Sequence, residues 1–126
     1  MQVNAPISLG ELMDKLSILK VKLNKIPDSD KRKSVQLEYK LLLGIAAKPL
    51  REIKGLREKL AQLEAINEDL WGVLGHQRAK EFQNKFDKEF VYLSRAVYFK
   101  NDERFKIKDD INRLTASLIK EQKHYE

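Results

Sequence analysis

The sequence predicts an all-α fold: an antiparallel bundle of about four helices in a single domain, residues 1–126, with long, coiled-coil-like third and fourth helices. Large apolar residues recur every three or four positions, which is the spacing of one helix face. Glycine and proline are scarce, with 5 and 3 residues, and charged residues make up 35%, a composition typical of long helices with solvated faces. No stretch shows the alternating pattern of a half-buried strand.

The first helix has a clear start at Ser8. Ser8 and Glu11 form a capping box, in which the serine hydroxyl accepts from the Glu11 amide and the glutamate reaches back. The next apolar residues alternate spacings of three and four, as in a heptad seam: Leu9, Leu12, Leu16, Leu19, Leu23 and Ile26. The stretch Pro27–Asp30 ends this helix and offers a cap for the next one.

A second helix is predicted from about Lys31 to Leu43. Gly44 and Pro49 predict a break, with Pro49 in the first turn of the third helix. The third helix carries the strictest repeat in the chain: Ile53, Leu56, Leu60, Leu63, Asn67, Leu70 and Leu74.

Polar and small residues interrupt the third helix. Asn67 occupies an a position of the heptads, where a buried asparagine commonly fixes register at some cost in stability. Trp71 is predicted to anchor the core. Gly72 and Gly75 predict fraying or a kink near this tryptophan.

The fourth helix is predicted to begin with Asp87 as its cap and to reach about Ser117, and Leu118–Glu126 either extends it or turns back. Its apolar stripe is broken, because Lys100 or Asn101 and then Arg104 take core-facing positions. A charge on such a stripe costs several kcal/mol unless it is paired. The break therefore requires an internal partner or a ligand.

Two interpretations of this break stay open. In the first, polar side chains converge into a pocket for a small anionic ligand, a phosphate or a carboxylate. The candidate residues are Lys15, Arg95, Tyr98, Asn101, Asp102, Arg104 and Lys108. In the second, the charges form an internal network in which Asp102 and Glu11 or Asp14 neutralise Arg95 and Arg104.

Glu11 and Asp14 are also candidate acidic site residues. They lie three positions apart on one helix face, an E-x-x-D spacing that could hold Mg²⁺ as in the all-helical nucleotide pyrophosphohydrolases. Such a site needs a second acidic pair on a facing helix, for which Glu68 and Asp69 are the best candidates. Alternatively, Glu11 belongs to the capping box and Asp14 favours the positive helix start. We expect no resident metal or other cofactor.

The uneven charge of the chain bears on which partners it could bind. The net charge of +6 arises in residues 1–60, which hold 13 Lys and Arg against 7 Asp and Glu, whereas residues 61–126 hold 12 of each. A basic half could bind nucleic acid, anionic lipid or an acidic protein partner. Nucleic acid is not expected, because Lys31–Lys33 lacks interleaved aromatic residues. His76 and His124 are predicted to be surface residues.

Cysteine is absent, which excludes disulfides, thiolate metal sites and a cysteine nucleophile. No apolar run approaches the ~20 residues that span a bilayer, and Met1–Leu9 has no signal-peptide pattern. We therefore expect a cytoplasmic protein.

Ser8–Lys15, Asn67–Trp71 and Leu93–Arg104 carry the patterns S-x-G-E-L-x-D-K, N-x-x-L-W and L-x-R-x-V-Y-x-x-N-D-x-R. In this combination the chain resembles a bacterial family known only as a domain of unknown function. Further matching residues extend the resemblance over most of the chain: Lys108, Ile111, Asn112 and Glu121–Tyr125. The family is often encoded near, or fused to, sugar-transfer and surface-polysaccharide genes, so the resemblance implies that setting and no established activity.

One departure from the family pattern bears on the metal hypothesis. The family carries an acidic pair three and four residues after the tryptophan, with an arginine further on. Here those positions hold Leu74 and Gly75, although Arg78 remains. A metal site built on that pair would be lost in this chain.

Together these observations predict a non-enzymatic module that forms a homo-oligomer or docks on a protein partner. The cluster from Arg95 to Lys108 would serve as an anionic-ligand pocket or as a specificity network. The alternative is a small enzyme acting on a phosphorylated or nucleotide-sugar substrate. It would use Glu11 and Asp14 with three cationic residues, Arg95, Arg104 and Lys108.

Overall fold

The computed structural model describes residues 1–115 and contains four helices in that range. They are α1 (Leu9–Lys25), α2 (Ser29–Glu52), α3 (Leu56–Phe82) and α4 (Lys88–Thr115). No strand occurs in these residues. The all-helical bundle predicted from the sequence is confirmed. None of the four helices is both long and apolar enough to cross a membrane.

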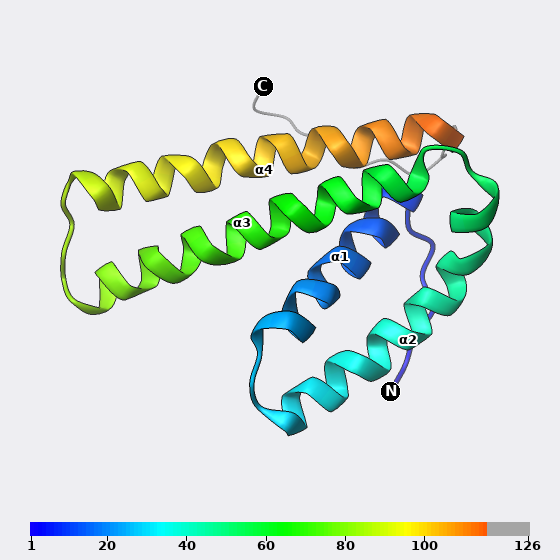
Figure 1. The fold of residues 1–126 in the computed structure, drawn as a ribbon, viewed down its shortest axis with the longest axis horizontal. Coiled ribbons are helices and arrows are strands. Elements are labelled where there is room, and N and C mark those ends of the chain that lie inside the picture. Colours follow the sequence, from blue (N-terminus) through cyan, green and yellow to red (C-terminus); the bar gives the residue numbers. More distant parts are fainter. Residues whose placement is uncertain (116–126) are drawn as a thin grey trace.

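Figure 1 shows α4 returning along α3, while α1 and α2 form a second helix pair inclined to the first. The first helix is central to the packing, because α1 contacts each of the other three helices, whereas α2 packs mainly on α1. The residues that are least exposed come from all four helices: Met13, Leu16, Ala46, Leu56, Leu63 and Ile111. A side chain on the inner face of α1 can therefore meet α3 and α4 together.

Side-chain caps fix the starts of three helices. The Ser8 hydroxyl accepts a hydrogen bond from the Glu11 amide at 3.1 Å, as the capping box predicts. Asp28 accepts from two amides at the start of α2, and Asp87 Oδ1 accepts from the Phe90 amide at 2.9 Å. The predicted starts of the first and fourth helices are correct, since these oxygens satisfy amides that lack a partner in the helix.

The predicted break between Leu43 and Pro49 is wrong. α2 continues through Gly44 and Pro49 to Glu52. Ala46 is fully buried and Leu50 is nearly so, and this burial stabilises the helical course that glycine and proline disfavour. The chain turns instead at Gly55, whose φ of 87° lies in the left-handed region that a residue without a Cβ adopts at low cost.

The predicted fraying or kink near Trp71 is also wrong, because α3 continues as a helix to Phe82. A Cβ at Gly72 or Gly75 would meet nothing within 4 Å, so both glycines lie on an open helix surface. Trp71 itself is 39% exposed. It is therefore not the core anchor that its size suggested.

An ion pair joins the two ends of the α3–α4 connection. Lys80 Nζ lies 2.8 Å from Asp87 Oδ2 and 3.1 Å from Glu89 Oε2. The hydrogen bond from Lys80, followed by the bond from the Phe90 amide, lowers the pKa of Asp87 from its ordinary value of 3.8. The folded state thus favours the ionised carboxylate more than the unfolded chain does.

We expect the Asp87→Asn variant to lose part of the acid sensitivity of the wild type. A carboxyl whose pKa is lowered by folding contributes stability that is fully present above its unfolded pKa, about 4. That contribution disappears as the pH falls through the lower, folded pKa. Thermal unfolding of both proteins between neutral and strongly acidic pH should show their melting temperatures converging in acid. A constant difference at every pH would contradict this assignment.

Candidate functional site

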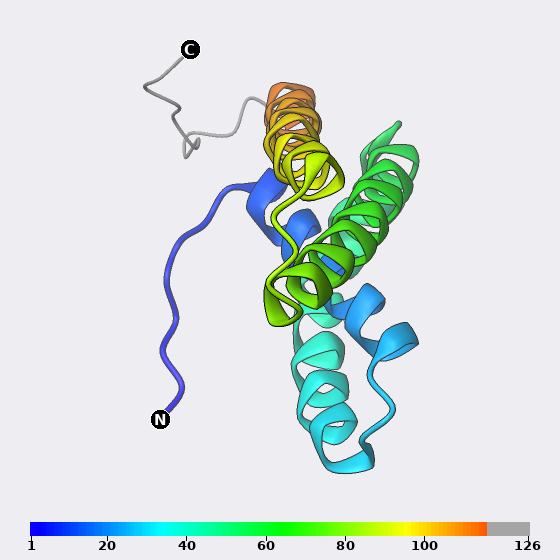
Figure 2. The ribbon, with the colours of Figure 1, turned by 90° about the vertical axis from the view of Figure 1, so that its left-hand side faces the viewer.

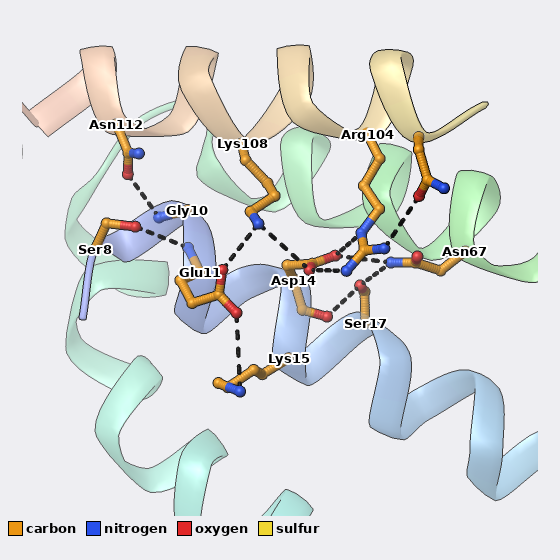
Figure 3. A network of polar contacts seen from close by, with 11 residues as sticks. Ser8, Gly10, Glu11, Asp14, Lys15, Ser17, Asn67, Arg104, Lys108 and Asn112 are labelled. Carbon is orange, nitrogen blue, oxygen red and sulfur yellow. Dashed lines mark hydrogen bonds and ion pairs between the residues drawn. The ribbon is translucent and has the colours of Figure 1, made fainter. Parts of the chain in front are cut away.

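The polar break in the α4 stripe faces α1, where two carboxylates meet it. Figure 3 shows Arg104 and Lys108 reaching from α4 toward Asp14 and Glu11. Arg104 Nε donates to Asp14 Oδ1 at 2.9 Å, and Nη2 donates to Oδ2 at 2.6 Å. This bidentate arrangement matches the planar guanidinium to the carboxylate. The Asp14 side chain is only 1% exposed, so it depends on this pairing.

α3 supplies a further donor to the same carboxylate. Asn67 Nδ2 lies 3.0 Å from Asp14 Oδ1 and 2.7 Å from Ser17 Oγ. The Ser17 hydroxyl donates in turn to the backbone carbonyl of Asp14 at 2.7 Å. Residues of α1, α3 and α4 are therefore joined around one buried carboxylate.

Lys108 and Glu11 form the second pair of the site. Lys108 Nζ lies 2.8 Å from Glu11 Oε2 and 3.8 Å from Asp14 Oδ2. Only 7% of the Lys108 side chain is exposed, which makes its pairing with carboxylates energetically necessary. Lys15 lies 3.8 Å from Glu11 at the exposed edge. We refer to the following residues as the polar cluster: Glu11, Asp14, Ser17, Asn67, Arg104 and Lys108.

Next to the polar cluster, α4 caps the start of α1. Asn112 Oδ1 accepts from the Gly10 amide at 2.8 Å. A Cβ on Gly10 would lie 2.5 Å from the backbone carbonyl oxygen of Lys108 and 2.9 Å from Asn112 Oδ1. Glycine is therefore required here for the close approach of the two backbones.

The acidic partners of Arg104 and Lys108 are thus internal to the chain. Their nearest carboxylates are those of Asp14 and Glu11. Of the internal network that the sequence left open, the structure contains the pairing of Asp14 with Arg104, but Arg95 is not part of it. A phosphate or carboxylate ligand at this point would have to displace two built-in carboxylates. The polar cluster is therefore suited to joining α1, α3 and α4.

The structure does not bring all of the predicted site residues together. Asn101 lies at the edge of the cluster, where its Oδ1 accepts from Arg104 Nη1 at 3.4 Å. Arg95, Tyr98 and Asp102 are exposed on α4, and the Arg95 guanidinium lies 5.8 Å from the centroid of the Phe99 ring. Arg95 is nine positions before Arg104, which places the two on opposite sides of a helix with 3.6 residues per turn.

The carboxylates proposed as a second metal-binding pair lie elsewhere. Glu68 is 3.3 Å from Lys25, and Asp69 is 3.5 Å from Lys100, with both acids largely exposed. In residues 1–115 no three His, Asp or Glu side chains form a group suited to a metal ion. Glu11 and Asp14 face cationic groups instead. His76 is exposed, and His124 lies outside the described residues.

Sequence reasoning missed two polar members of the site. Ser17 follows Asp14 by three positions, so their shared helix face was a usable signal. Asn112 gave no such signal, because its partner Gly10 is 102 positions away. Only the packing of α4 against the start of α1 reveals that contact.

A family model described as a family of unknown function (DUF6165) matches residues 1–126. No curated protein and no solved structure matches the chain. The match covers all three segments that carried the resemblance, and it brings no activity with it.

Proposed function

We propose that this chain, which belongs to that family of unknown function, is a self-associating helical module whose α2 binds a second copy. The observation that supports this is an apolar stripe on the outer side of α2. Leu37, Leu41 and Ile45 are 63%, 52% and 65% exposed. Their spacing of four residues places them along one line of the helix.

α2 has two apolar faces, and the fold uses one of them. Tyr39, Leu42, Ala46 and Leu50 pack into the core, whereas the stripe of Leu37, Leu41 and Ile45 faces outward. Single exposed apolar residues are ordinary, but a contiguous exposed row of large ones marks an interaction surface. An amphipathic helix from a second molecule is a partner with the matching periodicity.

A hollow beside the stripe offers room for such a helix. It lies between α2 and the residues that precede α1, and its volume is about 850 Å³. Figure 2 shows this N-terminal segment running outside the four helices. Apolar residues from both sides line the hollow: Val3, Ala5, Ile7, Leu9, Leu12, Leu37, Leu41, Leu42 and Ile45. A docked helix would thus contact apolar side chains on two sides.

Charges beside the stripe favour an antiparallel second copy. Glu38 and Lys48 are both exposed on α2 and lie toward opposite ends of the stripe. When two α2 helices pair antiparallel about Leu41, Lys48 of each copy lies opposite Ser34 of the other. This position is four residues, or about one helical turn, from Glu38. Such contacts select orientation more than they add affinity. In this proposal the polar cluster fixes α1 against α3 and α4, and α1 in turn supports α2, which carries the interface.

We expect the Leu41→Gln variant to dissociate at concentrations where the wild type is dimeric. A polar amide at the centre of the stripe removes apolar burial and should raise the dimer Kd at least about tenfold, or 1.4 kcal/mol. Sedimentation equilibrium at micromolar concentrations measures this directly. The fold itself should be unaffected, because Leu41 is half exposed in the monomer.

The matched control is Phe82→Ser, which removes a 91% exposed apolar side chain at the far end of α3. This variant should associate as the wild type does. A wild type that sediments as a monomer at every accessible concentration would overturn the proposal. Equal weakening by both substitutions would show that association does not depend on the α2 stripe.

A further inference from the structure

A groove separate from the α2 stripe lies beside the polar cluster, between α1, α3 and α4. Its volume is about 400 Å³, which is within the range of small-molecule sites. Most of its lining is apolar, with polar side chains at a few points. The lining residues are Ile18, Val21, Lys22, Asn67, Leu70, Trp71, Leu74, Val97, Asn101 and Arg104.

Trp71 supplies a ring surface to this groove. It is 39% exposed although it is the only tryptophan of the chain and the largest apolar side chain available for the core. A partly exposed indole among aliphatic side chains is a stacking surface for a planar ring. The aliphatic walls, Ile18, Val21 and Val97 among them, would cover the remaining apolar surface of such a ring.

Asn67 brings a hydrogen-bond acceptor to the groove. The residue is 93% buried, since only 7% of its surface is exposed. The two side-chain hydrogen bonds to Asp14 and Ser17 are donated by Nδ2, and Oδ1 is the acceptor atom of this amide.

Asn101 and Lys22 add a donor and a positive charge. Asn101 Oδ1 accepts from Arg104 at 3.4 Å, which leaves its amide nitrogen as a donor at the groove. Lys22 lines the same groove and forms no salt bridge with any residue in the described part of the chain. The groove therefore offers an acceptor, a donor and an ammonium group around an indole.

We propose that this groove binds a small ligand with three features: a planar heterocyclic ring, an edge that carries a hydrogen-bond donor beside an acceptor, and one anionic group. A pyrimidine nucleoside monophosphate is the simplest ligand of this class. The ring stacks on Trp71, its edge donates to Asn67 Oδ1 and accepts from Asn101, and the phosphate lies near Lys22. Of the polar cluster, Asn67 and Arg104 line the groove, whereas Glu11 and Asp14 do not.

Fluorescence of Trp71 tests the proposal on the intact protein, because the single tryptophan lies in the site. Titration with UMP should change the emission along a saturable curve. Uridine should bind at least about tenfold more weakly, since it lacks the anionic group, and ribose 5-phosphate should leave the emission unchanged. Equal responses to UMP and ribose 5-phosphate would overturn the ring requirement, and no saturable response to UMP would overturn the site.

Two variants assign the binding to the groove. Asn101→Leu and Lys22→Ala should each weaken UMP binding at least about tenfold while retaining the wild-type melting temperature. The control Lys106→Ala removes the same charge from an exposed position of α4 and should bind UMP as the wild type does. Unchanged affinity in both groove variants would refute the assignment. If Lys106→Ala weakened UMP binding as much as Lys22→Ala, the loss would come from net charge, and this result too would refute the assignment.

Discussion

The Arg104→Leu variant is expected to lose about 3–5 kcal/mol of unfolding free energy, the cost of breaking a buried ion pair by removing one partner. The loss is large because the Asp14 carboxylate is only 1% exposed. Without Arg104, its partners among residues 1–115 would be Asn67 at 3.0 Å and Lys108 at 3.8 Å. Urea denaturation of both proteins at neutral pH measures the difference. Leucine fills much of the arginine volume, so the effect reports on charge more than on packing.

The complementary variants make this a test of pairing. Asp14→Leu alone should destabilise by a similar amount, because it leaves the guanidinium without its bidentate partner. The double variant Asp14→Leu with Arg104→Leu should be destabilised by much less than the sum, since two apolar side chains can replace a buried ion pair at low cost. Additive effects would show that the two side chains do not act as a pair. An Arg104→Leu protein as stable as the wild type would contradict the structural role given to the pair.

The Gly10→Ala variant should be destabilised by about 1–3 kcal/mol, the usual cost of overpacking. The added methyl group would lie 2.5 Å from the Lys108 carbonyl oxygen, which is backbone and cannot rotate away. The start of α1 must then move from α4, which lengthens the hydrogen bond between the Gly10 amide and Asn112. Thermal or urea unfolding measures the loss.

Gly72→Ala is the matched control for this substitution. Gly72 lies inside α3, and a Cβ there meets nothing within 4 Å. Alanine should therefore stabilise the protein by up to about 1 kcal/mol, the difference in helix propensity between the two residues. Opposite signs at the two positions are the expected result. Stabilisation by Gly10→Ala would contradict the close approach of α1 to the Lys108 carbonyl oxygen of α4.

The caps and apolar periodicities of the chain were sufficient to predict four helices. Ser8 and Asp87 start their helices as predicted because a cap is a local interaction within one turn. The end of α2 could not be predicted in this way. Gly44 and Pro49 disfavour a helix locally, but the burial of Ala46 and Leu50 against other helices outweighs that preference.

In the candidate site, too, features within one helix could be predicted from the sequence, whereas contacts between helices could not. The sequence singled out Arg104 and Lys108 because they interrupt an apolar stripe, and both lie in the polar cluster. It also grouped Arg95 with them by proximity along the chain, although the turn of the helix places it on the exposed side. Which carboxylate meets which cation depends on how α1 crosses α4, and no single helix encodes that angle.

The ninety positions between Asp14 and Arg104 have a consequence for biosynthesis. A ribosome releases the first helix long before the guanidinium that pairs with its carboxylate has been made. Until then Asp14 remains hydrated, because burying it alone would cost several kcal/mol. The inner face of α1 therefore cannot take its final packing before α4 is present. We therefore expect the final packing of α1 against α4 to form only after α4 has been synthesised.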